Sequence, residues 1–199
     1  MEVLLMNTLI RTAKVLEIFV KILQTIFLVA AIVLAVAIVM LAVFNVEAYE
    51  FSSSLEIGHF TFELTSFDPE TVQDYFLWMA LPAIAVLAVW YLIMGVIRRI
   101  LLPMKDGKPF DTAVSINLRK LSWITLIGGF AASVLELISH VAMYRLFDFP
   151  TLFAGEGIAS CGIQYNMDMK FVFGFLILSL FSCIFRYGEE LQKQSDETL

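Results

Sequence analysis

Charged residues are scarce in this 199-residue chain, where they make up 16% of the total. Soluble domains contain about 25%. Hydrophobic residues reach 60%, and the excess lies in four long blocks. This composition excludes an ordinary soluble domain and predicts an integral membrane protein. The 13 Lys and Arg residues form no dense patch, so we expect no direct nucleic-acid binding.

Cysteine is also rare, with two residues in the chain. Cys161 falls in a predicted outer loop and Cys183 within a predicted span, so we expect both to be unpaired. Neither has the spacing of a metal or redox motif. We therefore expect no cofactor and no resident metal.

The apolar blocks predict an all-α membrane protein, a four-helix transmembrane bundle that forms a single membrane domain over residues 1–199. Spans near 20 residues match the roughly 30 Å hydrocarbon core of a bilayer. The predicted spans are 22–44, 75–97, 121–144 and 171–185, separated by outer loops 45–74 and 145–170 and by a middle loop 98–120.

The positions of Lys and Arg predict the orientation. They precede the first span, fill the middle loop and follow the fourth span, whereas the two outer loops hold only Arg145 and Lys170. By the positive-inside rule, both termini and the middle loop are cytoplasmic, and the lipid bilayer is the first partner.

The first outer loop is acidic and contains no Lys or Arg. Within it, "SLEIGHFTFEL" (54–64) alternates on both sides of Gly58, which predicts a small extracytoplasmic β-hairpin. The following "SFDPE" predicts a helix start, with Asp68 as N-cap and Pro69 as the first helical residue.

An acid and an imidazole interrupt the third span. Glu136 and His140 are four residues apart, so they share a helix face and can touch. They predict either a proton-responsive polar site or a self-satisfied pair near the outer interface. A zinc site completed by His59 or a loop acid is a weaker alternative. Nearby Gly128 and Gly129 favour close helix packing.

The middle loop and the tail carry the more specific patterns. Asp106-Gly107 indicates a turn, and Asp111 can cap the third helix. "GKPFDTAVSINLRKLSW" and "FRYGEELQKQSDETL" resemble the YoaS-like family of bacterial four-span membrane proteins, a domain of unknown function. The matching residues are Gly107, Pro109, Phe110, Asn117, Leu118 and Arg119, then Arg186, Tyr187, Gly188, Leu191, Gln192, Asp196, Thr198 and Leu199.

That resemblance implies a bacterial cytoplasmic membrane, no established catalytic residues, and a small helix-turn-helix regulator as partner. We therefore expect a non-enzymatic membrane sensor or regulator that acts through a cytoplasmic protein partner. The predicted partner-binding residues are Asn117, Arg119, Arg186, Tyr187, Leu191 and Gln192. The alternative is a subunit of a transporter or channel. A homo-oligomer also fits, and anchoring of the basic residues to anionic lipid is the simpler explanation of their role.

Overall fold

The structure of the protein is a computed structural model. It describes residues 2–43, 53–57, 60–64, 69–146, 148, 151, 162 and 169–197. Three predictions fall on residues outside these ranges: the N-cap role of Asp68, the loop position of Cys161 and the zinc ligand His59.

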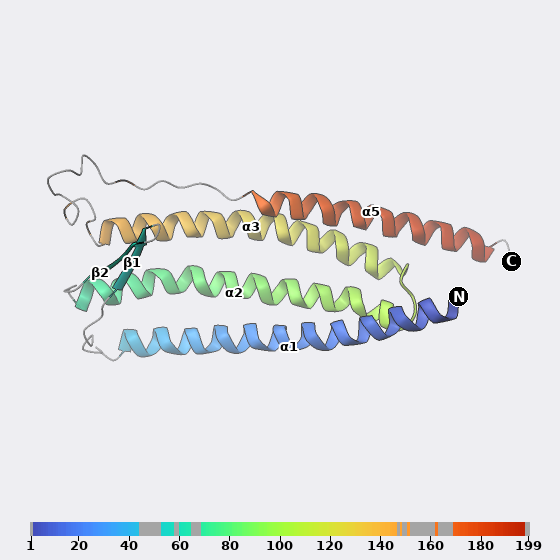
Figure 1. The fold of residues 1–199 in the computed structure, drawn as a ribbon, viewed down its shortest axis with the longest axis horizontal. Helices are drawn as coiled ribbons and strands as arrows, with labels where there is room; N and C mark the ends of the chain where they lie inside the picture. Colours follow the sequence, from blue (N-terminus) through green and yellow to red (C-terminus); the bar gives the residue numbers. More distant parts are fainter. Residues whose placement is uncertain are drawn as a thin grey trace. The chain divides into compact units, whose positions relative to one another are not determined.

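Four long helices dominate the described residues (Figure 1). They are α1 (Glu2–Val43), α2 (Pro69–Lys105), α3 (Thr112–Leu146) and α5 (Lys170–Glu197). All four are long and apolar enough to cross a membrane, which defines a multi-pass membrane protein. Each helix extends beyond its predicted span because backbone hydrogen bonding continues into the flanking polar segments.

The helix ends confirm several local predictions. Helix α2 begins at Pro69, and Gly107 has a φ of +76°, the left-handed conformation that its turn needs. Asp111 precedes α3, and its Oδ1 accepts a hydrogen bond from the Ala113 amide at 2.7 Å. This is an N-cap, and it fixes where α3 starts.

The chain folds into two compact units. The first unit comprises residues 1–31, 85–133 and 167–199. In it α2 lies between α1 and α3, and α5 lies beside α3 (Figure 1). One apolar cluster joins α2 to α3 around Val96, Val114 and Leu118, and a second joins α1 to α2 around Val20 and Met94.

Two glycines allow the helices of this unit to approach closely, as predicted. A Cβ added at Gly128 would lie 2.8 Å from Val89 Cγ1 on α2. One added at Gly129 would overlap the Cβ of Phe171 on α5 and lie 2.5 Å from its Cγ. Both distances are well inside carbon–carbon contact. At Gly128 the Val89 side chain would have to shift, whereas at Gly129 the close atom is a Cβ, so the helix itself would have to move.

The second unit comprises residues 32–84 and 134–166. It contains the strands β1 (Ser53–Ile57) and β2 (Phe60–Leu64), in the segment where the sequence predicts a hairpin. The strands pair antiparallel, with Ser53 opposite Leu64 and Ile57 opposite Phe60. The extracytoplasmic position of this hairpin stays a prediction.

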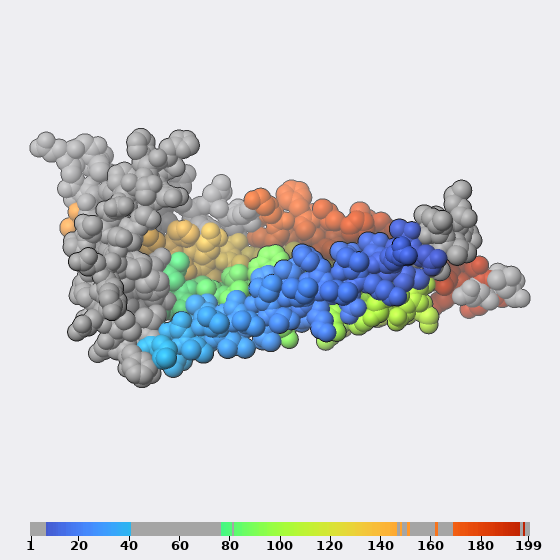
Figure 2. Space-filling model, turned by 60° about the horizontal axis from the view of Figure 1, so that its bottom comes forward, coloured from blue at the N-terminus to red at the C-terminus, as the bar shows by residue number. Residues whose placement is uncertain are grey.

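The surface of α1 is apolar over most of its length. An 18-residue window within Asn7–Met40 contains no residue buried inside the chain. Residues 7–31 form a continuous band along the face shown in Figure 2. An apolar surface of this extent is stable in a bilayer or against another chain, but not in water.

Candidate functional site

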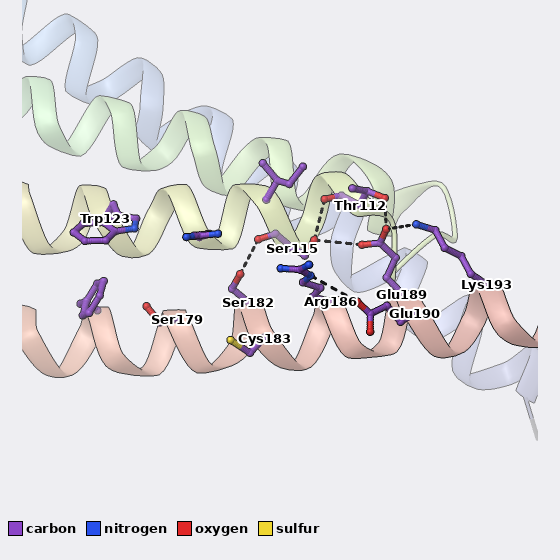
Figure 3. Close-up of a pocket in the computed structure, with 13 residues that line it drawn as sticks. Thr112, Ser115, Trp123, Ser179, Ser182, Cys183, Arg186, Glu189, Glu190 and Lys193 are labelled. Carbon is purple, nitrogen blue, oxygen red and sulfur yellow. Dashed lines mark hydrogen bonds and ion pairs between the residues drawn. The ribbon is translucent and has the colours of Figure 1, made fainter.

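A polar network joins the start of α3 to the last turns of α5 (Figure 3). Its centre is Glu189, whose residue surface is 8% exposed. The Glu189 carboxylate accepts hydrogen bonds from the Thr112 hydroxyl, from Ser115 Oγ at 3.5 Å and from Lys193 Nζ at 2.7 Å. A further hydrogen bond joins the same two helices, from Ser182 Oγ to the Ser115 carbonyl oxygen at 2.9 Å. The carboxylate is thus surrounded by donors from both helices.

Apolar packing holds the same junction together. A Cβ added at Gly188 would lie 2.6 Å from Phe110 Cδ1 and 2.7 Å from its Cε1. The Phe110 ring also packs against Phe185, with centroids 5.8 Å apart. The turn before α3 therefore docks on α5 through Phe110, because Gly188 leaves room for the ring.

An open groove runs along the same two helices, with a volume of about 690 Å³. Its polar part holds Arg119 on α3 together with Arg186, Glu190 and Lys193 on α5. Its apolar part holds Trp123 and Phe175, whose rings are 5.3 Å apart. Figure 3 shows Trp123 displaced along the helices from Arg186 and Lys193, so the groove is amphipathic along its length.

The cations that line this groove differ in whether they have an ion-pair partner. Lys193 is paired with Glu189, and Arg186 Nε lies 3.8 Å from Glu190 Oε1. Arg119 is exposed, and no ion pair to its guanidinium is found among the residues that the structure describes. Among the described residues, the groove thus contains one cation, Arg119, without an ion-pair partner.

A second polar cluster links α1 to α2. Glu17, with 15% of its side chain exposed, lies 3.6 Å from Arg98 Nε and 3.2 Å from Lys105 Nζ. Further along the same two helices, Phe27 stacks on Trp90 with ring centroids 5.9 Å apart. This cluster buries one acid between two cations, and its role in this arrangement is to hold the two helices in register.

The structure distributes the predicted partner-binding residues over separate surfaces. Arg119 and Arg186 line the groove between α3 and α5. Asn117 is buried, and its Nδ2 donates to the Ala113 carbonyl at 2.7 Å. Gln192 lines a smaller hollow of about 240 Å³ beside Phe110.

Tyr187 and Leu191 occupy a different face of α5. They are 63% and 48% exposed. Their spacing of four residues places them side by side on the helix. They are therefore the members of the predicted set that offer apolar surface to another molecule.

Glu136 and His140 lie in the second unit, and both are exposed. His140 Nδ1 is 2.8 Å from the backbone carbonyl oxygen of Glu136. The imidazole therefore contacts the main chain of Glu136, and a contact between the two side chains stays a prediction. The neighbouring Ser139 is buried and donates to the Leu135 carbonyl at 2.9 Å.

Sequence reasoning did not identify Glu189 or Glu17. Both pair with residues on another helix, at separations of 77 residues for Thr112 and 88 for Lys105. No local signal singled out Glu17, because it precedes the predicted first span and has Lys14 and Lys21 within about one turn on the same helix.

Comparison with known proteins places the chain in no family. No family model matches it, and neither a curated protein nor a solved structure is significantly similar. What can be stated of its class comes from the helices themselves, which are those of a multi-pass membrane protein.

Proposed function

We propose that this protein is a membrane-embedded sensor or regulator that acts through a soluble protein partner. The partner binds at the end of the helices where α2 turns into α3. In the proposed orientation this end of the helices is cytoplasmic. The excess of Lys and Arg at this end supports the orientation.

One observation carries the proposal. Tyr187 and Leu191 stay exposed on a helical segment that is otherwise rich in charge, from Arg186 to Lys193. The predicted fourth span ends at residue 185, so this segment extends past the apolar layer. Two adjacent apolar side chains on an amphipathic helix are typical of a helix that docks in a partner's groove.

The resemblance of residues 107–119 and 186–199 to the YoaS-like family supports a partner class. The resemblance implies that the partner is a small helix-turn-helix regulator. Such a regulator is a soluble protein of suitable size to dock on one helix face. Under this proposal the membrane is the cytoplasmic membrane of a bacterium, and the protein carries out no catalysis itself.

Site-specific photocrosslinking tests the partner. A photoreactive amino acid is placed at Tyr187 or Leu191, and in matched controls at Phe173 or Leu180, which are 67% and 61% exposed on the apolar part of the same helix. We expect adducts with one soluble protein in native membranes from the first two positions only. Adducts solely with other membrane proteins, or with further copies of this chain, would instead favour a transporter subunit or a homo-oligomer.

We further propose that Glu136 and His140 receive the signal through protonation. The crosslinking yield at Tyr187 is then measured as a function of external pH. We expect Glu136→Gln to remove the pH dependence and Arg145→Gln, an exposed change on the same helix, to preserve it. An unchanged pH profile in Glu136→Gln would reject this role.

A further inference from the structure

The groove between α3 and α5 has the features of a binding site rather than of a packing defect. Its volume of about 690 Å³ lies within the roughly 300–1,000 Å³ typical of sites for small ligands. Its lining changes from charged to aromatic along the helix axes (Figure 3). A ligand that fits both parts must itself be charged at one end and apolar at the other.

The polar end selects an anion. Arg119 and Arg186 both line it, one from each helix, and the carboxylates of Glu189 and Glu190 are already engaged by Lys193 and Arg186. Guanidinium groups form bidentate hydrogen bonds with phosphate oxygens, which makes arginine well suited to phosphate recognition. Ser179, which also lines the groove, adds a hydroxyl.

The apolar end accommodates a hydrocarbon chain. Trp123 and Phe175 form one wall there, and Trp123 is 49% exposed. Along α5, Phe175 lies about 16 Å from Arg186 at 1.5 Å per residue. The interfacial layer of a bilayer is about 5–7 Å thick on each side, so a point about 16 Å from the phosphate lies about 9–11 Å inside the hydrocarbon layer, beside the middle of an acyl chain.

We propose that this groove binds one anionic phospholipid, with the phosphate between Arg119 and Arg186 and an acyl chain over Trp123 and Phe175. Basic pockets between membrane helices bind such head groups. This inference does not rest on the proposed function, because it concerns a different face of α5 from Tyr187 and Leu191. It also holds for either orientation of the chain.

Quenching of Trp123 fluorescence by brominated lipids tests the proposal. Trp78→Phe and Trp90→Phe leave Trp123 as the reporter, in the full chain reconstituted into phosphatidylcholine vesicles. Brominated phosphatidylglycerol is compared with brominated phosphatidylcholine at the same mole fraction. We expect the relative association constant to favour phosphatidylglycerol about five-fold, the gain from one additional basic contact near the surface.

The variant Arg119→Gln/Arg186→Gln should bring this ratio close to one. Both arginines are exposed, so the exchange leaves the packing of α3 and α5 in place. Lys120→Gln is the matched control, because Lys120 is an exposed cation next to Arg119 that does not line the groove. A reporter chain that retains only Trp90, which stacks on Phe27 instead, should show equal quenching by the two lipids.

Three results would overturn the proposal. Equal quenching of Trp123 by both lipids would show that the groove does not select an anion. An equal loss in Lys120→Gln would show attraction by surface charge in general. Retention of the preference in Arg119→Gln/Arg186→Gln would show that these two arginines do not hold the lipid. None of these results bears on crosslinking at Tyr187, so the two proposals fail separately.

Discussion

Replacing Gly129 by alanine should weaken the contact between α3 and α5. The added Cβ would overlap the Cβ of Phe171 and lie 2.5 Å from its Cγ and 3.0 Å from its Cδ1. Rotation of the Phe171 side chain cannot relieve the overlap, because the Cβ is fixed to the backbone. The start of α5 must therefore move away from α3 until carbon atoms reach about 3.5–4.0 Å.

The expected cost follows from comparison with a second glycine. Overpacking of an ordered interior costs about 1–3 kcal/mol. Alanine also favours a helix over glycine by about 0.8–1 kcal/mol, which offsets part of that cost. Gly95→Ala carries the same helical gain, but its Cβ would meet only the end of the flexible Gln24 side chain, at 3.3 Å. We expect Gly129→Ala to be about 1–3 kcal/mol less stable than Gly95→Ala.

Reversible unfolding of the full chain in mixed micelles, with increasing dodecyl sulfate, measures this difference. Gly174→Ala should fall between the other two, because its Cβ would lie 3.2 Å from Thr125 Cγ2. Equal unfolding midpoints for the Gly129 and Gly95 variants would refute the close approach of α3 and α5.

A second substitution makes the steric argument sharper. Phe171→Ala leaves the overlapping Cβ in place, so it should not restore stability to Gly129→Ala. Phe171→Gly removes that Cβ and should restore part of it. Full rescue by Phe171→Ala would mean that the ring, and not the backbone, sets the distance between the helices.

The other predictions use the same unfolding assay. Asp111→Ala removes the N-cap of α3 and should cost about 1 kcal/mol, whereas Asp111→Asn keeps an acceptor and should stay near wild type; equal losses would refute the cap. Gly188→Ala should destabilise the junction, and Phe110→Ala should rescue it because the overlap involves ring atoms; failure of that rescue would argue against this contact. Glu189→Gln should lower the unfolding midpoint more than Glu190→Gln, since only Glu189 accepts hydrogen bonds from α3; the reverse order would contradict the network.

The membrane helices could be predicted from sequence because the signal is local. An apolar run of about 20 residues identifies a span without knowledge of its neighbours. Caps and turns are local as well, so Pro69, Gly107 and Asp111 are placed correctly. The helices are longer than the predicted spans, because polar residues end a membrane span without ending the helix.

The candidate site could be predicted only in part because it is assembled across helices. Arg119 and Arg186 were singled out by type, but their common groove depends on the packing of α3 against α5. Glu189 was not singled out at all, since an acid in a charged helical segment is ordinarily solvated. Its buried position depends on Thr112, 77 residues away in the chain.

The two stretches that carry the family resemblance turn out to be packing partners of each other. Phe110 of the first stretch rests on Gly188 of the second, and Thr112 donates to Glu189. The presence of these residues in the two stretches is explained by their contribution to the stability of the junction. They are therefore weak evidence of a surface that binds a partner. A partner surface is better sought among residues of the same stretches that stay exposed. Tyr187 and Leu191 meet that condition, which is why the crosslinking experiment starts from them.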